Sequence, residues 1–276
     1  MNNYTIQTAV SRLFEEQLAN WELARKNYQA LKQVKTKTLF VDGCEYKVQF
    51  NPERLTSSAA KVDAQSIRER KCFLCAENRP SEQKGILFNE RYTILVNPYP
   101  IFPRHLTIPA IEHTPQRIKN RLGDMLDLAR QLDDYTVFYN GPECGASAPD
   151  HFHFQAGSKG FLPIEKETNR FNAFRIESNN NGEIIDRFQQ IYYSLPLQPE
   201  DNEPMINILA WYESEKWVVY IFPRKKHRPA CYSEEGEANL LISPAAVDLG
   251  GVFITPLEKD FCKVTAKDIR QILHEV

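Results

Sequence analysis

The chain has 276 residues, 42% of them hydrophobic, with a formal net charge of −2 and an isoelectric point near 6.3. A chain of this length can bury a large core, as one domain or as two closely packed halves. Its charge gives no general attraction to nucleic acid or to an anionic membrane, so any phosphate binding must be local. The sequence has neither a membrane span of ~20 apolar residues nor a signal-peptide pattern, so we expect a cytoplasmic protein whose cysteines are reduced thiols or metal ligands.

The first third of the chain predicts a helix, a hairpin and short strands. Apolar residues repeat at helical spacing and predict one long helix near residues 3–33, whose face packs in the core or against a second subunit. Asp42-Gly43 is a hairpin signal between strands over 38–41 and 45–50. Further strands are expected near residues 86–88, 92–96 and 106–108.

The middle and end of the chain continue this mixed pattern. Thr114 can cap, and Pro115 can open, a helix that runs to about Leu132. Strands are expected over 136–139, 151–155, 206–212 and 217–222, with a helix near 183–195. Thr265 is expected to begin the last helix, with Asp268 in the capping-box position. A Pro-rich, acidic link near residues 197–204 separates two α+β halves.

The segment His151-Phe152-His153-Phe154-Gln155 alternates polar and aromatic side chains. In a strand, His151, His153 and Gln155 share one face, and the two phenylalanines share the other. Two imidazoles and an amide on one face need a metal, a phosphate or a hydrogen-bond partner for each ring nitrogen. This row is therefore the first candidate for a functional site.

The loop before this strand is rich in small residues. Gly145 and Ser147 allow backbone N–H groups to approach an anion closely. Asn140 begins the loop. It either contacts the sugar or the phosphate oxygens of a substrate, or simply forms a turn before Gly141.

The H-x-H-x-Q row resembles the active-site strand of the transferase branch of the histidine-triad superfamily, which includes galactose-1-phosphate uridylyltransferase, diadenosine tetraphosphate phosphorylase and GDP-galactose phosphorylase. Residues 103–109 and 112–118 are similar to the superfamily's P-x-H-x-L-x-I-P strand and the turn after it, and the likeness covers roughly residues 72–157. It implies an α+β fold with a histidine-triad antiparallel sheet and helices. It also implies duplication, with a catalytic half at 1–160 and a degenerate half at 161–276 packed on it.

Cys72 and Cys75 can supply two of the four ligands that a tetrahedral zinc requires. The resemblance implies that His113 and His151 complete a closed, structural zinc site, and His105 is a rival to His113. A redox pair or two unrelated core cysteines are the other interpretations.

The resemblance also assigns catalytic roles. We expect His153 to attack an α-phosphorus and to hold the nucleotidyl group as a phosphoramidate. Gln155 can donate to a phosphate oxygen but cannot deliver a proton, which favours transfer to an acceptor other than water. Asn140, Gly145 and Ser147 are expected to contact the substrate.

A basic run in the second half adds candidate phosphate contacts. Lys225, Lys226 and Arg228 follow a predicted strand, in a segment that loosely echoes the one around Arg104. All four are predicted to bind substrate; a solvated turn is the alternative for the second-half cluster.

The sequence thus predicts a zinc-containing nucleotidyltransferase or phosphorylase. The expected donor is a nucleotide-sugar or a dinucleoside polyphosphate, and the expected acceptor is phosphate or a sugar phosphate. A homodimer is an open alternative to a monomer. A hydrolase of nucleotide conjugates and a non-catalytic nucleotide-binding protein are the competing functions.

Overall fold

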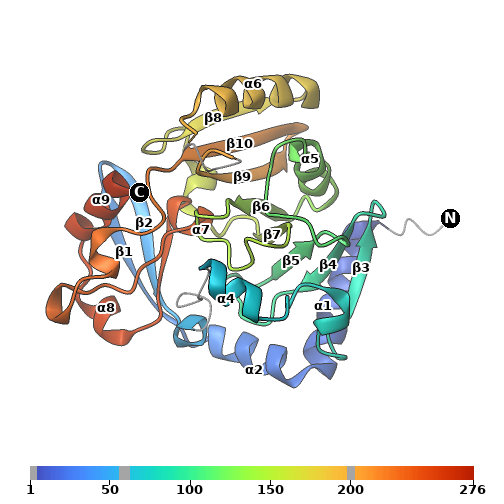
Figure 1. The fold of residues 1–276 in the computed structure, drawn as a ribbon, viewed down its shortest axis with the longest axis horizontal. Coiled ribbons are helices and arrows are strands. Elements are labelled where there is room, and N and C mark those ends of the chain that lie inside the picture. The colour runs from blue at the N-terminus through green and yellow to red at the C-terminus, as the bar shows by residue number, and fades with distance from the viewer. Residues whose placement is uncertain (1–4, 56–62, 198–202) are drawn as a thin grey trace.

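The computed structural model describes residues 5–55, 63–197 and 203–276. Its centre is an eight-stranded antiparallel sheet in the order β3-β4-β5-β7-β6-β9-β10-β8 (Figure 1). The strands are β3 (Gly85–Phe88), β4 (Tyr92–Val96), β5 (His105–Pro109), β6 (Tyr135–Asn140), β7 (His153–Ser158), β8 (Phe174–Ser178), β9 (Ile206–Glu213) and β10 (Lys216–Pro223). A smaller sheet has the order β1-β2-β11, from β1 (Lys35–Val41), β2 (Cys44–Phe50) and β11 (Val252–Thr255).

Helices pack on one face of the large sheet, and the small sheet with its own helices lies on the other (Figure 1). The helices are α1 (Ile6–Asn20), α2 (Glu22–Leu31), α4 (Ala64–Glu69), α5 (Leu122–Gln131), α6 (Asn181–Ser194), α7 (Ala246–Leu249), α8 (Glu258–Lys263) and α9 (Ala266–Glu275). Short 3-10 turns lie at Pro52–Arg54, Ala76–Asn78, Pro163–Lys166, Ala230–Tyr232 and Gly236–Ala238. Among the described residues, no helix has the length and apolar character needed to cross a membrane.

Each face of the large sheet has its own hydrophobic core. Phe152 and Phe154 face a core that includes residues of α1, α2, α5 and α6. Phe138 and Leu209 face a second core formed with the small sheet, α7 and α9. Because side chains alternate along a strand, the polar residues His153 and Gln155 lie on this second face. The small sheet and the C-terminal helices therefore cover the face that carries the candidate site.

Several predicted elements are confirmed. The hairpin turns at Asp42-Gly43, where both residues have positive φ, and β1 pairs with β2 in antiparallel register. The predicted strands of both halves and the helix near 183–195 are present. Thr265 caps α9, and Asp268 completes the capping box. The α+β class with a large antiparallel sheet is also confirmed.

The single long N-terminal helix was a wrong prediction. Trp21 has extended backbone angles, φ −117 and ψ 103, and separates α1 from α2. Its ring is buried in the same core as Phe14 and Tyr28. Breaking the helix at Trp21 lets both segments turn an apolar face to the sheet, which helical periodicity alone does not reveal.

The helix predicted to open at Pro115 was also wrong, because α5 begins only at Leu122. The backbone between Thr114 and Gln116 bonds to the segment that precedes β7 instead of to itself. Phe152 N donates to Thr114 O at 2.6 Å, and Gln116 N donates to Pro149 O at 3.1 Å. For the same reason β7 starts at His153 and not at His151.

Short elements escaped prediction, namely α4, α7, α8, β8 and β11. The large sheet continues across residue 160, since β6 pairs with β9 through Val137↔Ala210 and Asn140↔Asn207. The division into halves and the duplication stay predictions, and the link at 197–204 lies partly outside the described residues.

Gly157 tests the packing behind β7. A Cβ at this position would lie 2.3 Å from the ring of buried Phe102. We expect Gly157→Ala to lower the free energy of unfolding by roughly 1–3 kcal/mol, the usual cost of overpacking. Gly123→Ala is the control, because its Cβ would meet only Ile185 at 3.8 Å, and alanine in a helix gains ~0.5–1 kcal/mol. Urea unfolding of both variants measures this, and equal stability of the two would contradict it.

Candidate active site and metal centre

Four predicted metal ligands lie together in the structure. The ligand atoms of Cys72, Cys75, His113 and His151 are all within 4.8 Å of one another. His151 Nδ1 is 3.3 Å from Cys72 Sγ and 3.5 Å from Cys75 Sγ, and His113 Nδ1 is 3.2 Å from Cys75 Sγ. Zn–S bonds of ~2.3 Å and Zn–N bonds of ~2.0–2.1 Å separate tetrahedral S and N ligands by roughly 3.5 Å, so the cluster fits one zinc ion.

The two imidazoles are oriented by contacts behind the cluster. His151 Nε2 lies 2.8 Å from Ala110 O, so this nitrogen donates and Nδ1 is left with a lone pair toward the thiols. His113 Nε2 lies 3.7 Å from an oxygen of Asp150, which also pairs with Arg70 at 2.5 Å. Partners of this kind fix the ring orientation that a metal ligand needs.

The electrostatics of the two thiols differ. Burial opposes ionisation of Cys72, but its contact with the His151 ring and the backbone N–H groups of Leu74 and Cys75 lower its pKa overall. Burial and the neighbouring Cys72 raise the pKa of Cys75. A cation between the thiols would favour the thiolate form of both. The imidazoles beside them favour a metal site over a redox pair.

His153 has a fixed tautomer. Its Nδ1 lies 2.9 Å from the carbonyl oxygen of His151, so Nδ1 carries the proton and Nε2 keeps its lone pair. Burial, together with the nearby charge of His151, lowers the pKa of His153 to about 4. The imidazole is therefore neutral at physiological pH, which is the form that can act as a nucleophile.

Gln155 is oriented by His105 on the neighbouring strand β5. Ile101 N donates to His105 Nδ1 at 3.2 Å, so the ring proton is on Nε2 and donates to Gln155 Oε1 at 3.1 Å. The amide NH₂ of Gln155 is then the end that can donate to a ligand. Burial and the charge of Arg54 lower the pKa of His105 to about 3. His105 is not in the cysteine–histidine cluster, whose third ligand in space is His113.

Gln116 is a residue that the sequence analysis did not select. It is fully buried, and its Nε2 donates to Asn140 O at 2.9 Å and to His153 O at 3.0 Å. Its Oε1 accepts from His153 N at 2.7 Å. The strand pairing of β6 and β7 ends at Phe138↔Gln155, so Gln116 joins the two strands beyond that point and holds the backbone of His153.

Asn140 lies at the end of β6 in a buried polar network. Its Oδ1 accepts from Asn207 Nδ2 at 2.8 Å and from Ala246 N at 2.9 Å. Asn207 on β9 also donates to Cys144 O at 2.8 Å, and its Oδ1 accepts from Arg224 Nη1 at 2.7 Å. The sequence analysis did not select Asn207 or Arg224, because polar residues at the ends of strands have no distinctive spacing.

The loop from Gly141 to Asp150 is held close to the second half of the chain. Gly145 has φ +93, and a Cβ there would lie 2.6 Å from Ala245 Cβ. Glycine is required at this position for both reasons. Ser147 is half-buried in the same loop. A cavity of about 220 Å³ lies beside the loop and is lined by Gln116, Arg117, Glu143, Cys144 and Glu203, among others.

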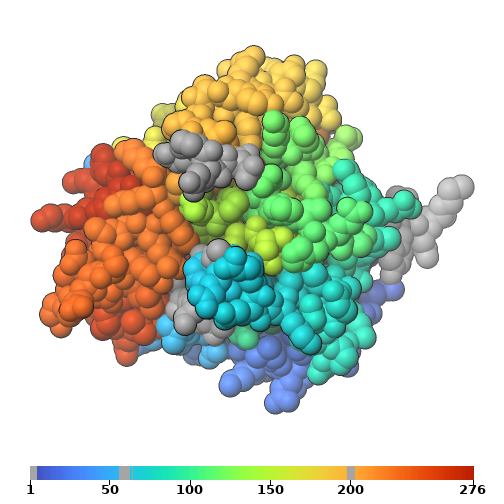
Figure 2. All heavy atoms as spheres, viewed as in Figure 1, coloured from blue at the N-terminus to red at the C-terminus, as the bar shows by residue number. Residues whose placement is uncertain are grey.

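The loop region is accessible from one side of the molecule. In the space-filling view, yellow-green atoms of the segment around residues 140–155 appear in a hollow between the orange C-terminal segment and the cyan α4 (Figure 2). Atoms of α4 and of the C-terminal segment therefore lie on either side of this segment.

The predicted cation Arg104 points away from this region. Its Nη1 donates to Ser11 Oγ of α1 at 3.4 Å, on the face of the sheet opposite to His153.

The basic run of the second half contacts the C-terminal part of the chain. Lys225 Nζ donates to His274 O at 3.2 Å, and Lys226 Nζ pairs with Glu275 at 2.7 Å. Arg228 Nε donates to Ser243 Oγ at 3.2 Å. A substrate-binding role for these three residues and for Arg104 stays a prediction.

Arg54 is a cation near the row that the sequence analysis missed. It ends the turn after β2, and its Nη1 donates to Tyr99 O at 2.7 Å. Its Nε is shielded from solvent and has no hydrogen-bond partner among the described residues. Its charge acts on His105, the residue whose ring contacts Gln155. An orphaned guanidinium N–H at this position suits an anionic ligand.

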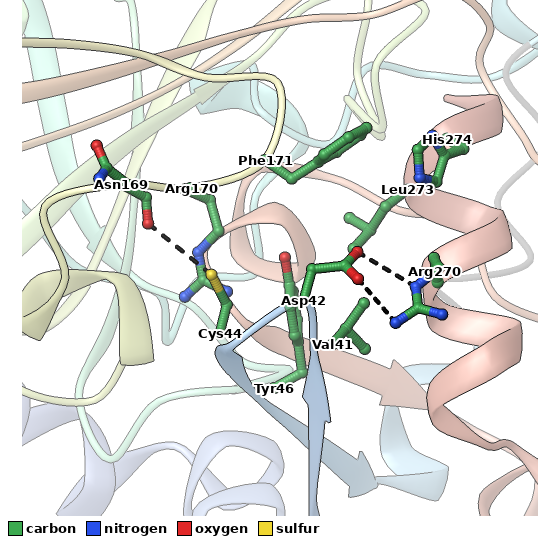
Figure 3. A pocket seen from close by; sticks show the side chains of 10 residues that line it. All are labelled: Val41, Asp42, Cys44, Tyr46, Asn169, Arg170, Phe171, Arg270, Leu273 and His274. Atoms are coloured by element: carbon green, nitrogen blue, oxygen red, sulfur yellow. Dashed lines mark hydrogen bonds and ion pairs between the residues drawn. The ribbon is translucent and has the colours of Figure 1, made fainter.

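A second pocket, of about 280 Å³, lies apart from His151 and His153. It is formed between the β1–β2 hairpin, the segment around Arg170 and α9 (Figure 3). The Arg170 guanidinium lies over the ring of Tyr46 and pairs with Glu167 at 2.8 Å. Arg270 pairs with Asp42 at 2.7 Å (Figure 3). Both arginines of this pocket are ion-paired with carboxylates, although Arg170 Nε has no hydrogen-bond partner among the described residues. None of the residues of the histidine row or of the cysteine–histidine cluster lines the pocket, so it is not the candidate active site.

Comparison with known proteins places the chain in a family. Residues 13–158 match the family described as "Domain of unknown function (DUF4922)", and the chain belongs to it. A stretch of 119 residues is 28% identical to galactose-1-phosphate uridylyltransferase of Bacillus subtilis (strain 168). The match covers 37% of this chain but only 23% of that enzyme, so the chain spans about a quarter of the length of this curated relative.

Solved structures show the same fold over almost the whole chain. Yeast Ap4A phosphorylase Apa2 superposes with a TM-score of 0.60 at 16% identity, covering 91% of this chain and 96% of the other. The structure of its complex with Ap4A has a TM-score of 0.60 at 15% identity and covers 97% of this chain and 96% of the other. The structure of its complex with AMP has a TM-score of 0.57 at 15% identity and covers 93% of this chain and 96% of the other. The resemblance to the transferase branch of the histidine-triad superfamily is confirmed by these likenesses.

The Gln116 clamp can be tested by stability. Gln116→Ala removes two donated hydrogen bonds and one accepted bond from buried backbone groups. Each buried group left unsatisfied costs ~1–3 kcal/mol, so we expect a loss of at least ~2 kcal/mol in the free energy of unfolding. Gln65→Ala, which removes an exposed bond to Glu69, is the control and is expected to stay within ~0.5 kcal/mol of the wild type. Chemical denaturation checks this, and a Gln116 variant as stable as the control would refute the clamp.

Proposed function

We propose that the protein is a nucleotidyltransferase of the phosphorylase or uridylyltransferase type that works through a nucleotidyl-histidine intermediate on His153. The observation that carries this proposal is the geometry of the row. His153 is neutral and has its lone pair on Nε2, while the neighbouring Gln155 has its NH₂ end available for a ligand. The nucleotidyltransferase relatives and the shared fold support the proposal.

The reaction proceeds in two displacements. In the first, His153 Nε2 forms a bond to the α-phosphorus, and the bond from that phosphorus to the bridging oxygen of the leaving group breaks. The Nδ1 proton stays on the ring, where the His151 carbonyl stabilises the imidazolium charge. In the second, an acceptor oxygen attacks the phosphorus and the P–N bond breaks, which restores the neutral imidazole.

The donors around His153 stabilise charge on the transferred group. Gln155 is positioned to donate to a phosphate oxygen, and Asn140 and the Gly145–Ser147 loop are candidates for the others. Arg54 is a further candidate, because its Nε lacks a partner. An amide in place of a third histidine orients the phosphate without moving a proton. An anionic acceptor needs positioning and charge neutralisation more than deprotonation.

We infer that Cys72, Cys75, His113 and His151 hold a zinc ion. All four positions are occupied by protein ligands, so the site is closed and the metal has a structural role. Bound zinc would cross-link the two thiols and the two imidazole rings. The consequence for chemistry is indirect, since His151 is both a ligand and the residue whose carbonyl orients His153.

The donor is proposed to be a dinucleoside polyphosphate or a nucleotide-sugar, and the acceptor phosphate or a sugar phosphate. The yeast relative has been solved with Ap4A and with AMP, which supports a nucleotide substrate for this fold. Cytoplasmic location and a homodimer stay expectations.

Zinc analysis tests the metal site. We expect one zinc per chain, lost in Cys72→Ser and in Cys75→Ser, and both variants should be markedly less stable because metal binding is coupled to folding. Cys262→Ser, an exposed free thiol, is the control and should keep zinc and stability. Plasma emission spectrometry and thermal unfolding measure both quantities. Wild-type protein without stoichiometric metal would argue against the site.

Trapping the intermediate tests the function. Wild-type protein incubated with a donor and no acceptor should form an acid-labile adduct on the peptide containing His153, and His153→Ala should form none. Because burial lowers the pKa of His153 to about 4, the imidazole is unprotonated above that pH. We therefore expect the rate of adduct formation to stay nearly constant from pH 8 to pH 5 and to fall toward pH 4. Mass spectrometry of quenched samples, with zinc content checked at each pH, measures this.

The donor panel comprises GDP-, UDP- and ADP-sugars and Ap4A. An adduct on His151, or no adduct with any donor, would contradict the mechanism. In the same assay, added phosphate or hexose 1-phosphate should raise turnover far above the rate in water. Equal rates with and without these acceptors would favour a hydrolase, and ligand binding without turnover would favour a non-catalytic nucleotide-binding protein.

A further inference from the structure

Arg224 is a buried arginine at the end of β10 in the second half of the chain. Its guanidinium donates five hydrogen bonds to oxygen atoms of the described residues. Four of these oxygens belong to the main chain, at Pro244, Lys226, His227 and Val276. The fifth is the side-chain oxygen of Asn207, 2.7 Å from Nη1. Arg224 therefore has a rigid position, and one of its N–H groups is directed to a side chain of the large sheet.

This contact fixes the amide of Asn207. A guanidinium can only donate, so the atom that faces Arg224 must be the oxygen of Asn207 and not the nitrogen. The NH₂ group of Asn207 then points the other way, to Asn140 Oδ1 and to Cys144 O, both at 2.8 Å. Arg224 thus decides which end of Asn207 meets Asn140.

Asn207 in turn fixes the amide of Asn140. Asn140 Oδ1 receives two N–H groups, from Asn207 and from Ala246 at the start of α7. Its NH₂ group is therefore the end left for a ligand. Asn140 is next to His153, because Gln116 Nε2 bonds to the main-chain oxygens of both residues. Asn140 lies on β6 and Asn207 on β9, and Arg224 directly follows β10; these three strands are adjacent in the sheet.

We propose that Arg224 and Asn207 are positioning residues, through which the second half of the chain orients the Asn140 amide as a hydrogen-bond donor to the phosphoryl group carried by His153. A donor that follows a charged group in a chain of hydrogen bonds is also polarised, which strengthens its bond to an anionic oxygen. This inference rests on the proposed function and adds to it a role for the second half.

Asn207→Asp is the most informative variant. The carboxylate keeps a partner in Arg224, with which it forms an ion pair, but it cannot donate to Asn140 Oδ1. The Asn140 oxygen then faces a carboxylate and is held by Ala246 N alone, so the amide loses the fixed direction in which it presents its NH₂ group to the phosphoryl oxygen. Asn20→Asp, at an exposed position of α1, is the matched control. Arg224→Lys is a second variant, because it keeps the charge but not the planar fork of donors.

Single-turnover kinetics of His153 adduct formation give the readout, together with zinc content and the unfolding midpoint. Loss of one donor to a developing oxyanion costs ~10²–10³ in rate. We expect Asn207→Asp to lower the saturated rate by at least ~10-fold, with the half-saturating donor concentration changed less than ~3-fold and zinc retained. Arg224→Lys should lower the same rate, and Asn20→Asp should leave it unchanged.

A merely structural role predicts something different. If folded, zinc-loaded Asn207→Asp and Arg224→Lys form the adduct at the wild-type rate, the positioning role is overturned while the proposed function stands. If the wild type forms no adduct with any donor of the panel and binds neither AMP nor inorganic phosphate by calorimetry, the proposed function and this inference both fail. If Asn207→Asp does not fold, the rate of folded Arg224→Lys decides.

Discussion

The two roles of His151 are the constraint on which the site depends. Its imidazole lies against two thiols and a second imidazole, while its main-chain carbonyl, two bonds away from the same side chain, accepts the Nδ1 proton of His153. Whatever holds the ring in the cluster therefore also holds the carbonyl, and the carbonyl decides which nitrogen of His153 keeps a lone pair. A proposed zinc ion without any contact to substrate would in this way set the tautomer and direction of the nucleophile.

Backbone atoms perform much of the orientation that the row requires. Ala110 O fixes the His151 ring, Ile101 N fixes the His105 tautomer and through it the Gln155 amide, and Gln116 fixes the main chain of His153. Burial keeps both His105 and His153 neutral by lowering their pKa values. The buried imidazoles of His105 and His153 are tolerated beside the Gln155 amide because Nδ1 of each ring has a main-chain partner and His105 Nε2 bonds to Gln155.

The two halves of the chain are joined through one sheet. The pairing of β6 with β9 brings Asn140 opposite Asn207, and the small sheet with α7 and α9 covers the face that carries the row. The H-x-H-x-Q row belongs to the first half, but its surroundings are built from both. This arrangement explains how a second half without an H-x-H-x-Q row is still part of the site in the proposed mechanism.

The sequence alone determined the α+β class, the hairpin, most strands, the row and the cysteine pair of the cluster, because alternation in a strand and the spacing of two cysteines are local patterns. The two histidines of the cluster were implied only by the family resemblance, with His105 as a rival to His113. The sequence did not reveal the break at Trp21 or the loop at Thr114–Gln116, since in both places burial and backbone bonds to distant segments replace the helix that local propensity favours. Only the tertiary structure selected His113 over His105 in the cluster and directed Arg104 away from the row. It also brought Arg54, Gln116, Asn207 and Arg224 to the site. These residues carry no sequence signal, because a polar side chain at the end of a strand acquires its role only from the partners that the sheet places beside it.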